Sequence, residues 1–260
     1  MREPYRAGPG ITTLPSDLPI PGLGLQPVNG YLAAGREPVL VDSGMPVDSA
    51  AFEAMLWTHV DPDDLRWVVV THDDRDHTGA LMRILRAAPR ARLVTSPVSA
   101  VRLSEEFSLP EGRVVTANPG GRLETADRVL SFHRPPVFDS PGTLAVLDSA
   151  TGSLFASDSF GTVLPGPAEH PFDHGEERFF SGFSILNRAI APWTAMVDQE
   201  RFATAVAALR GLRPRRMLSA HAPPVEGGMD RLFAAMAELP LLPPWLPEAD
   251  LEGALDASAP

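Results

Sequence analysis

Apolar and polar positions follow one another along the chain in short blocks that predict both strands and helices. Residues 65–71 read LRWVVVT, a nearly continuous apolar run that is typical of a strand buried on both faces. Shorter strand-like segments bounded by turn residues are residues 30–34, 38–42, 92–96, 129–132, 143–147 and 153–156. The helical period appears instead in residues 49–59, 78–88, 199–209 and 229–238.

The two ends of the chain depart from this pattern. Residues 1–26 are rich in proline and glycine, and we expect them to wrap around the edge of the domain. Residues 240–260 are rich in proline and acidic residues and are expected to form a tail. Because strands and helices alternate between these ends without an internal repeat, the sequence predicts one layered α/β domain over residues 1–260.

Composition removes several classes of function. The formal net charge of −11 argues against nucleic acid and anionic membrane as partners, because binding to phosphates needs a basic face. The 260 residues include no cysteine, which excludes disulfides, thiolate nucleophiles and iron–sulfur clusters. There is also no lysine, so Schiff-base chemistry is excluded. The amino terminus lacks the apolar segment of a signal peptide, and we expect a cytoplasmic protein.

The chemistry is concentrated directly after the buried strand of residues 65–71. His72, Asp74, Asp76 and His77 follow within six positions, at the edge of a sheet where open α/β folds place their ligands. Imidazole and carboxylate are common ligands of first-row metals. Asp73, Asp74 and Asp76 would also repel one another unless a cation lay among them. Each residue alone fits an acidic surface turn better, but the set favours a metal site.

The segment resembles the His-x-[His/Glu/Asp]-x-Asp-His signature of the metallo-β-lactamase superfamily. Four further segments resemble that superfamily in the same order: residues 28–44 with Asp42, 138–148 with Asp139, 154–161 with Asp158, and 217–224 with His221. The resemblance implies an α/β fold, an αββα four-layer sandwich of two mixed sheets flanked by helices. The segments around Asp74 and Asp158 are most similar to the flavodiiron and oxygen-binding diiron branch.

The resemblance also implies a set of metal ligands. The first ion would be held by His72, Asp74 and Asp139. The second ion would be held by Asp76, His77 and His221, although the position of His77 is not always a ligand in the flavodiiron group. Asp158 would bridge the two ions.

Two of these positions depart from the superfamily's pattern. Asp74 and Asp139 stand where histidines are usual, and the diiron branch itself keeps a histidine at the position of Asp139. His133 is the alternative ligand there, but six residues along a strand is about 20 Å, so we expect it not to reach. His170 is a candidate to support the ligands from the next loop, against the plainer interpretation of a polar surface loop.

The donor set favours iron over zinc. Four carboxylates would neutralise two zinc ions completely, whereas carboxylate-rich sites suit iron or manganese. Manganese and zinc remain open. The first hypothesis is therefore a diiron protein that binds or activates O₂. It would depend on an external reductase, because no flavodoxin-like segment is found in the 260 residues.

Two other hypotheses remain. The second is a metal-dependent hydrolase of an ester, thioester, lactone or phosphodiester acting on a small-molecule substrate. The third is a non-catalytic ligand sensor, motivated by the two replaced histidines. The aromatic residues Phe179, Phe180, Phe183 and Trp193 are expected in the core, with an apolar lid or a homodimer contact as the alternative.

Overall fold

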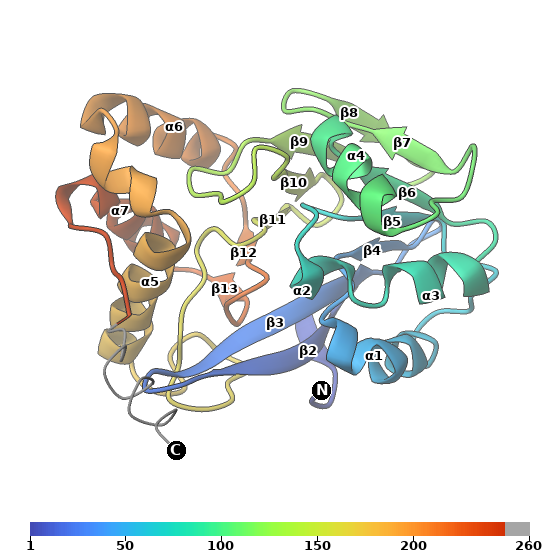
Figure 1. Cartoon of the computed structure of the whole chain (residues 1–260), viewed down its shortest axis with the longest axis horizontal. Coiled ribbons are helices and arrows are strands. Elements are labelled where there is room, and N and C mark those ends of the chain that lie inside the picture. Colours follow the sequence, from blue (N-terminus) through green and yellow to red (C-terminus); the bar gives the residue numbers. More distant parts are fainter. Residues whose placement is uncertain (248–260) are drawn as a thin grey trace, which may run out of the picture.

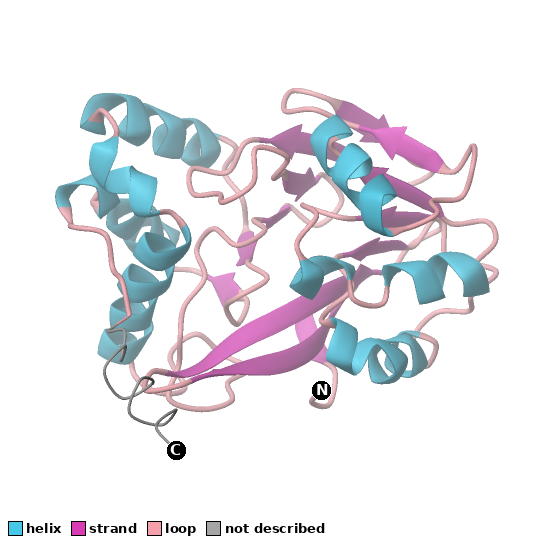
Figure 2. Cartoon of the chain, viewed as in Figure 1, coloured by secondary structure: helices cyan, strands magenta, loops and turns pink. Residues whose placement is uncertain are grey.

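Two mixed β-sheets lie face to face between two layers of helices, as the computed structural model shows for residues 1–247 (Figure 1). The helices cover only the outer faces of the pair, so the order of layers is helix, sheet, sheet, helix (Figure 2). This architecture confirms the predicted four-layer sandwich. Within residues 1–247, none of the helices is long and apolar enough to cross a membrane.

The first sheet has seven strands in the order of the chain. They are β1 (Tyr5–Gly8), β2 (Ile11–Ile20), β3 (Gly24–Ala33), β4 (Val39–Val41), β5 (Trp67–Val69), β6 (Arg92–Thr95) and β7 (Val114–Thr116). β1 to β4 pair antiparallel, and β4 to β7 pair parallel. The parallel part needs crossover connections, which supply the helices of the outer layer.

Those helices are short and cover the outer face of the first sheet. They are α1 (Ser49–Leu56), α2 (Arg75–Thr78), α3 (Leu81–Ala87) and α4 (Pro97–Glu106), with a 3₁₀ turn at Pro46–Asp48. Phe52 and Leu56 of α1 and Ile84 of α3 are fully buried against Leu40 and Val68 of the sheet. Apolar residues three and four positions apart therefore place α1 and α3, as their period predicted.

The second sheet has six strands in the order β13-β12-β11-β10-β9-β8. They are β8 (Arg122–Glu124), β9 (Val129–His133), β10 (Ala145–Asp148), β11 (Ser153–Phe155), β12 (Arg216–Leu218) and β13 (Val225–Glu226). Its outer face is covered by α5 (Glu176–Ile190), α6 (Gln199–Gly211) and α7 (Met229–Ala237), with 3₁₀ turns at Pro192–Met196 and Leu239–Leu241. Only β11 and β12 pair parallel, so this sheet is also mixed.

The two sheets are joined by an apolar core between their inner faces. Tyr31 and Val69 of the first sheet pack there with Phe132, Phe155 and Leu218 of the second, and all five are at most 2% exposed. The rings of Tyr31 and Phe155 lie 5.6 Å apart. This core fixes the distance between the two sheets, and hence between loops at their ends.

The expectation that residues 1–26 wrap the domain edge is wrong. They form β1, β2 and the start of β3, and the β2–β3 hairpin is the longest pairing in the first sheet (Figure 1). Pro15 and Pro19 lie opposite Asn29 and Leu25 of β3, whose N–H groups bond to Ala220 and Leu164 rather than to β2, so the pairing does not need an N–H at either proline. A strand with prolines at such positions thus resembles a loop in its composition.

Other elements differ from their predicted bounds or were not predicted. The helix expected over residues 78–88 begins only at Leu81, as α3, because the N–H groups of Gly79 and Ala80 bond to the carbonyls of Gly44 and Ser43 instead; the short α2 precedes it and was not predicted. α4, α5, β7, β8, β12 and β13 were not predicted at all. Of the predicted tail, residues 240–247 follow α7 with a 3₁₀ turn, and residues 248–260 lie outside the described residues.

Candidate metal centre

The seven predicted ligands come from loops at the ends of both sheets. His72, Asp74, Asp76 and His77 lie between β5 and the end of α2. The other three, Asp139, Asp158 and His221, lie in the loops that follow β9, β11 and β12. The structure brings all seven together in overlapping groups whose candidate ligand atoms lie within 4.8 Å of one another.

The first group surrounds the imidazole of His72. Its Nε2 atom lies 3.4 Å from Oδ2 of Asp158, 3.7 Å from Oδ1 of Asp139 and 3.8 Å from Oδ2 of Asp74. These spacings suit several atoms facing one central ion better than a single hydrogen bond. We call this group the outer position, because the side chains of Asp74 and Asp139 are 46% and 31% exposed.

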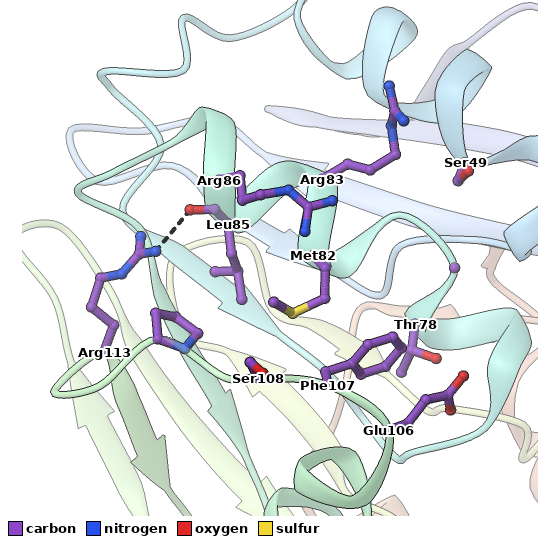
Figure 3. A pocket seen from close by; sticks show the side chains of 12 residues that line it. Ser49, Thr78, Met82, Arg83, Leu85, Arg86, Glu106, Phe107, Ser108 and Arg113 are labelled. Carbon is purple, nitrogen blue, oxygen red and sulfur yellow. Dashed lines mark hydrogen bonds between the residues drawn. The ribbon is translucent and has the colours of Figure 1, made fainter.

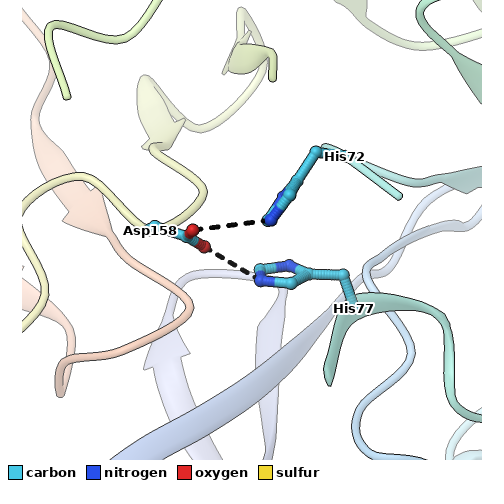
Figure 4. A group of neighbouring side chains, drawn as sticks. All are labelled: His72, His77 and Asp158. Atoms are coloured by element: carbon cyan, nitrogen blue, oxygen red, sulfur yellow. Dashed lines mark ion pairs between the residues drawn. The ribbon is translucent and has the colours of Figure 1, made fainter. Parts of the chain in front are cut away.

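The second group, the inner position, is formed by Asp76, His77 and His221. Nε2 of His77 lies 3.7 Å from Oδ1 of Asp76, and Nε2 of His221 lies 3.5 Å from Oδ2 of the same carboxylate. Both rings also face Oδ1 of Asp158, at 2.9 and 3.2 Å. Figure 4 shows Asp158 between His72 and His77, with one oxygen directed to each ring. Asp158 is thus shared by the two positions.

Each imidazole is oriented through its other nitrogen. Nδ1 of His77 lies 2.9 Å from Oδ2 of Asp42, and Nδ1 of His221 lies 2.8 Å from the carbonyl oxygen of Pro27. Nδ1 of His72 lies 3.1 Å from Oγ of Ser157. The acceptors beside His77 and His221 hold the proton on Nδ1, which leaves the Nε2 lone pair free for a metal.

The backbone around the site adopts conformations that side chains rarely take. Asp42, Ser157 and Phe160 have φ values of +58°, +56° and +65°. Such conformations cost about 1–3 kcal/mol each and persist where the surroundings enforce them. Two of these residues hold ligand imidazoles, so the strain belongs to the construction of this site.

Burial and charge oppose each other at the centre. Burial alone would raise the pKa of Asp158, but the imidazoles of His72 and His77 outweigh it and hold that pKa well below its usual value. Burial would likewise lower the pKa of His77, but Asp42, Asp76 and Asp158 raise it well above 6.5. The protein has therefore gathered acidic groups so densely that they favour positive charge at this centre, despite its burial.

The buried polar atoms fit a bound cation. Nε2 of His72, Nε2 of His77 and Oδ1 of Asp158 are inaccessible to solvent and have no hydrogen-bond partner of good geometry. Buried polar groups without partners are costly, and they are rare unless an ion or a water satisfies them. Two divalent ions would satisfy all three and neutralise the surrounding carboxylates. The donor set and the geometry both fit a dinuclear metal site.

A network around Asp73 was not predicted from the sequence. The Asp73 carboxylate accepts hydrogen bonds from Oγ of Ser99 at 2.7 Å, from Arg102 at 3.1 Å and from Oγ of Ser140 at 3.3 Å. Asp73 lies between His72 and Asp74, and Ser140 follows Asp139. The network therefore ties the two loops of the outer position to α4. The pair Ser96-Pro97, a helix N-cap followed by proline, is the signal that could have revealed α4.

The β2–β3 hairpin also contributes to the site. Nε2 of Gln26 lies 3.2 Å from Nδ1 of His221, beside the Pro27 carbonyl. Gln26 and Pro27 both lie on β3. The sequence had placed Gln26 at the end of the edge wrap of residues 1–26, and Pro27 directly after it. Only the pairing of β2 with β3 shows that this backbone passes beside the ligands.

Two other candidate histidines lie elsewhere. Nε2 of His133 lies 2.9 Å from Oγ of Ser131 on β9, and His133 belongs to none of the candidate metal groups within residues 1–247. The expectation that His133 does not reach the site agrees with this placement. His170 is exposed, and its backbone N–H donates to Asp173. Within residues 1–247, no hydrogen bond or ion pair links His170 to any of the seven ligands. Its supporting role therefore stays a prediction without structural support.

A separate cavity of about 650 Å³ lies behind the metal loop (Figure 3). Its walls include Thr78 and Gly79, which follow the last ligand of that loop, and Met82 and Phe107. It contains none of the seven predicted ligands. The guanidinium of Arg113 at its rim bonds to the carbonyl of Leu85 at 2.8 Å, near the end of α3. The cavity is thus a feature of helix packing distinct from the metal centre.

Comparison with known proteins places this chain among relatives of one kind. Residues 27–221 match the family described as "ODP family beta lactamase". The chain is 27% identical over 147 residues to "Coenzyme F420H(2) oxidase" of Methanothermobacter marburgensis, covering 54% of this chain and 36% of that protein. It is 32% identical over 139 residues to "Type A flavoprotein fprA" of Rhodobacter capsulatus, covering 52% and 32%. The chain thus spans about a third of the length of these relatives.

Solved structures agree on the fold. The flavodiiron protein from Giardia intestinalis superimposes with a TM-score of 0.77 at 17% identity, over 92% of this chain and 60% of that chain. Rubredoxin oxygen:oxidoreductase from Desulfovibrio gigas superimposes with a TM-score of 0.75 at 16% identity, over 91% and 60%. At this identity the likeness establishes the four-layer architecture alone.

Proposed function

This chain belongs to the ODP family beta lactamases, and from that premise we propose that it is a dinuclear iron oxidoreductase that binds and reduces O₂. The observation that carries the proposal is the convergence of three imidazoles and four carboxylates around three buried atoms without hydrogen-bond partners: Nε2 of His72, Nε2 of His77 and Oδ1 of Asp158. Relatives named as an F420H₂ oxidase and a flavoprotein support a redox role over a hydrolytic one.

The seven ligands would hold two metal ions. His72, Asp74 and Asp139 would hold one ion, Asp76, His77 and His221 the other, and Asp158 would bridge them. When bound, the iron pair would supply open coordination positions and the change between ferrous and ferric states. The carboxylate-rich donors favour iron or manganese over zinc, because they offset the higher charge of the ferric state.

The ligands of the outer position are the more exposed ones. Asp74 and Asp139 are partly exposed, whereas the side chains of His77 and His221 are 1% and 3% exposed. O₂ would therefore reach the centre past the outer carboxylates. Complete reduction of O₂ to two water molecules consumes four electrons and four protons, and we propose that a separate reductase supplies those electrons. Homodimer formation remains a prediction.

Metal content and O₂ uptake test the proposal together. Protein loaded anaerobically with ferrous iron is expected to retain two irons per chain and to develop an oxo-to-iron absorption band on exposure to air. With an excess of a chemical reductant it should consume O₂ catalytically. Asp158→Asn should lose both irons and the uptake, whereas Asp230→Asn, a change at a surface aspartate paired with Arg210, should retain both.

Two results would contradict the proposal. One is protein that holds two zinc ions and refuses iron, together with turnover of model esters, which would favour the metal-dependent hydrolase. The other is tight binding of two irons without any O₂ uptake in the presence of the reductant, which would favour a binding or sensing role.

A further inference from the structure

The two halves of the metal centre differ in the chemistry of their donors. The inner position offers two imidazoles, from His77 and His221, and the carboxylate of Asp76. The outer position offers one imidazole, from His72, and the carboxylates of Asp74 and Asp139. Asp158 faces both. The inner position is therefore richer in nitrogen, and the outer position is richer in oxygen.

The two halves also differ in exposure. The ligand side chains of the inner position are 1%, 3% and 25% exposed for His77, His221 and Asp76. At the outer position His72 is 1% exposed, but Asp74 and Asp139 are 46% and 31% exposed. An ion at the outer position would thus leave past two carboxylates that water can hydrate, whereas an inner ion has only one partly exposed ligand, Asp76.

The supports of the ligands differ in the same sense. The inner rings are held by the Asp42 carboxylate and by the backbone carbonyl of Pro27, at 2.9 and 2.8 Å. Such partners fix the ring and raise its basicity, and their loss commonly costs about 10–100-fold in metal affinity. Asp139 is positioned indirectly, through the bonds that its neighbour Ser140 makes to Asp73 and Arg102. The inner position is accordingly the better organised one.

From these differences we infer that the two metal positions are unequal: the inner one fills first and holds iron, and the outer one exchanges and accepts manganese from a mixture. The inference rests on the proposed dinuclear function. Imidazole binds Fe²⁺ better than Mn²⁺, whereas carboxylates suit Mn²⁺. The additional negative charge of Asp139 attracts both ions, which are divalent, to the same degree. An aspartate in place of a nitrogen donor therefore weakens the preference of this position for Fe²⁺, and its negative charge does not restore that preference.

Competition between the two metals tests the inference. Metal-free protein is incubated without oxygen with equal amounts of Fe²⁺ and Mn²⁺, desalted and analysed for both. The expected product holds one iron and a substantial share of manganese. Anomalous scattering at the iron and manganese edges should place the manganese beside Asp139, and electron paramagnetic resonance should show Mn²⁺ coupled to a neighbouring iron. Dialysis against a chelator should remove the outer ion first.

Two variants at one residue separate donor type from charge. Asp139→His supplies a second imidazole to the outer position and should lower the manganese-to-iron ratio there by about tenfold, the lower end of what altered ligand surroundings do to affinity. Asp139→Asn keeps an oxygen donor without the charge and should keep the manganese-to-iron ratio of the wild-type protein while binding both metals more weakly. Thermal unfolding of each metal-free variant shows whether the fold is retained.

The outcomes are distinct. Two irons bound with equal affinity, manganese found at the inner position, or an unchanged ratio in Asp139→His would overturn the inference and leave the proposed function standing. If the wild-type protein binds neither metal, the proposed function fails as well. If Asp139→His does not fold, Asp139→Asn still tests the inference. A manganese-to-iron ratio at the outer position of this variant that is as low as the ratio at its inner position would overturn it.

Discussion

Oδ2 of Asp42 lies 2.9 Å from Nδ1 of His77, on the side of the ring opposite the metal centre. The same carboxylate accepts two hydrogen bonds from Thr71, one from its backbone N–H and one from its hydroxyl group, both at 2.8 Å. Asp42 thus joins the end of β4 to the end of β5 and to α2. It determines which nitrogen of His77 faces the ions, although it is not itself a ligand.

Replacing Asp42 with asparagine should weaken the inner metal position. Asparagine tolerates the left-handed backbone of Asp42, but its amide nitrogen cannot accept a hydrogen bond from Thr71 or His77. We expect the affinity for the inner ion to fall by about 10–100-fold. The free energy of unfolding of the metal-free protein should fall by about 1–3 kcal/mol. Chelator competition and chemical denaturation measure the two effects, and an unchanged affinity would show that Asp42 does not orient the ring.

Replacing Asp73 with asparagine should act on the outer position instead. The change removes the charge that holds Ser99, Arg102 and Ser140, and with it the link between the loops of Asp74 and Asp139. We expect the outer ion to bind about tenfold more weakly, with little change at the inner position. Arg75→Gln is the control, because it breaks an exposed ion pair with Glu106 that contributes roughly 0–1 kcal/mol. An equal loss of affinity for both ions would contradict the prediction that Asp73 supports the outer position alone.

Two glycine-to-alanine changes should have opposite effects on stability. A Cβ atom at Gly79 would lie 2.1 Å from the backbone carbon of Met45, so Gly79→Ala must displace the metal loop. Overpacking of this kind costs about 1–3 kcal/mol or more. At Gly211, the last residue of α6, nothing lies within 4 Å of such an atom, and alanine should stabilise the helix by up to about 0.5–1 kcal/mol. Thermal unfolding compares the two variants; similar melting temperatures would refute the close contact.

Both tyrosines of the chain should resist ionisation in the folded state. Burial raises the pKa of Tyr5 from 10.0 to about 12 and that of Tyr31 well above 10. The unfolded state therefore loses these protons first, and stability that is complete below pH 10 should decline as the pH approaches 12. Absorbance of tyrosinate should be absent from the native protein at pH 10.5 and present in denaturant. Half-ionisation of the native protein near pH 10 would mean that the hydroxyls are exposed.

The sequence was sufficient where the chemistry is contiguous. His72 to His77 follow one buried strand, so spacing alone brought them together, while Asp139, Asp158 and His221 could be assigned only from the resemblance. The β2–β3 hairpin was missed because its prolines, which lie where the strand pairing needs no N–H, resemble those of a loop. The bond between Asp73 and Ser140 joins residues 67 positions apart, and no local pattern specifies it. Long-range contacts of this kind need the packed sheets.

The division of the ligands between two sheets has a consequence for local opening of the protein. Four of the seven come from the first sheet and three from the second, so a bound ion adds a further link between sheets that already meet through the Tyr31–Phe155 contact and the hydrogen bond from the Tyr31 hydroxyl to the carbonyl of Ser219. Separation of the sheets would then require loss of the ions. Amide hydrogen exchange at β11 and β12 should accordingly slow on metal binding, even though neither strand contains a ligand.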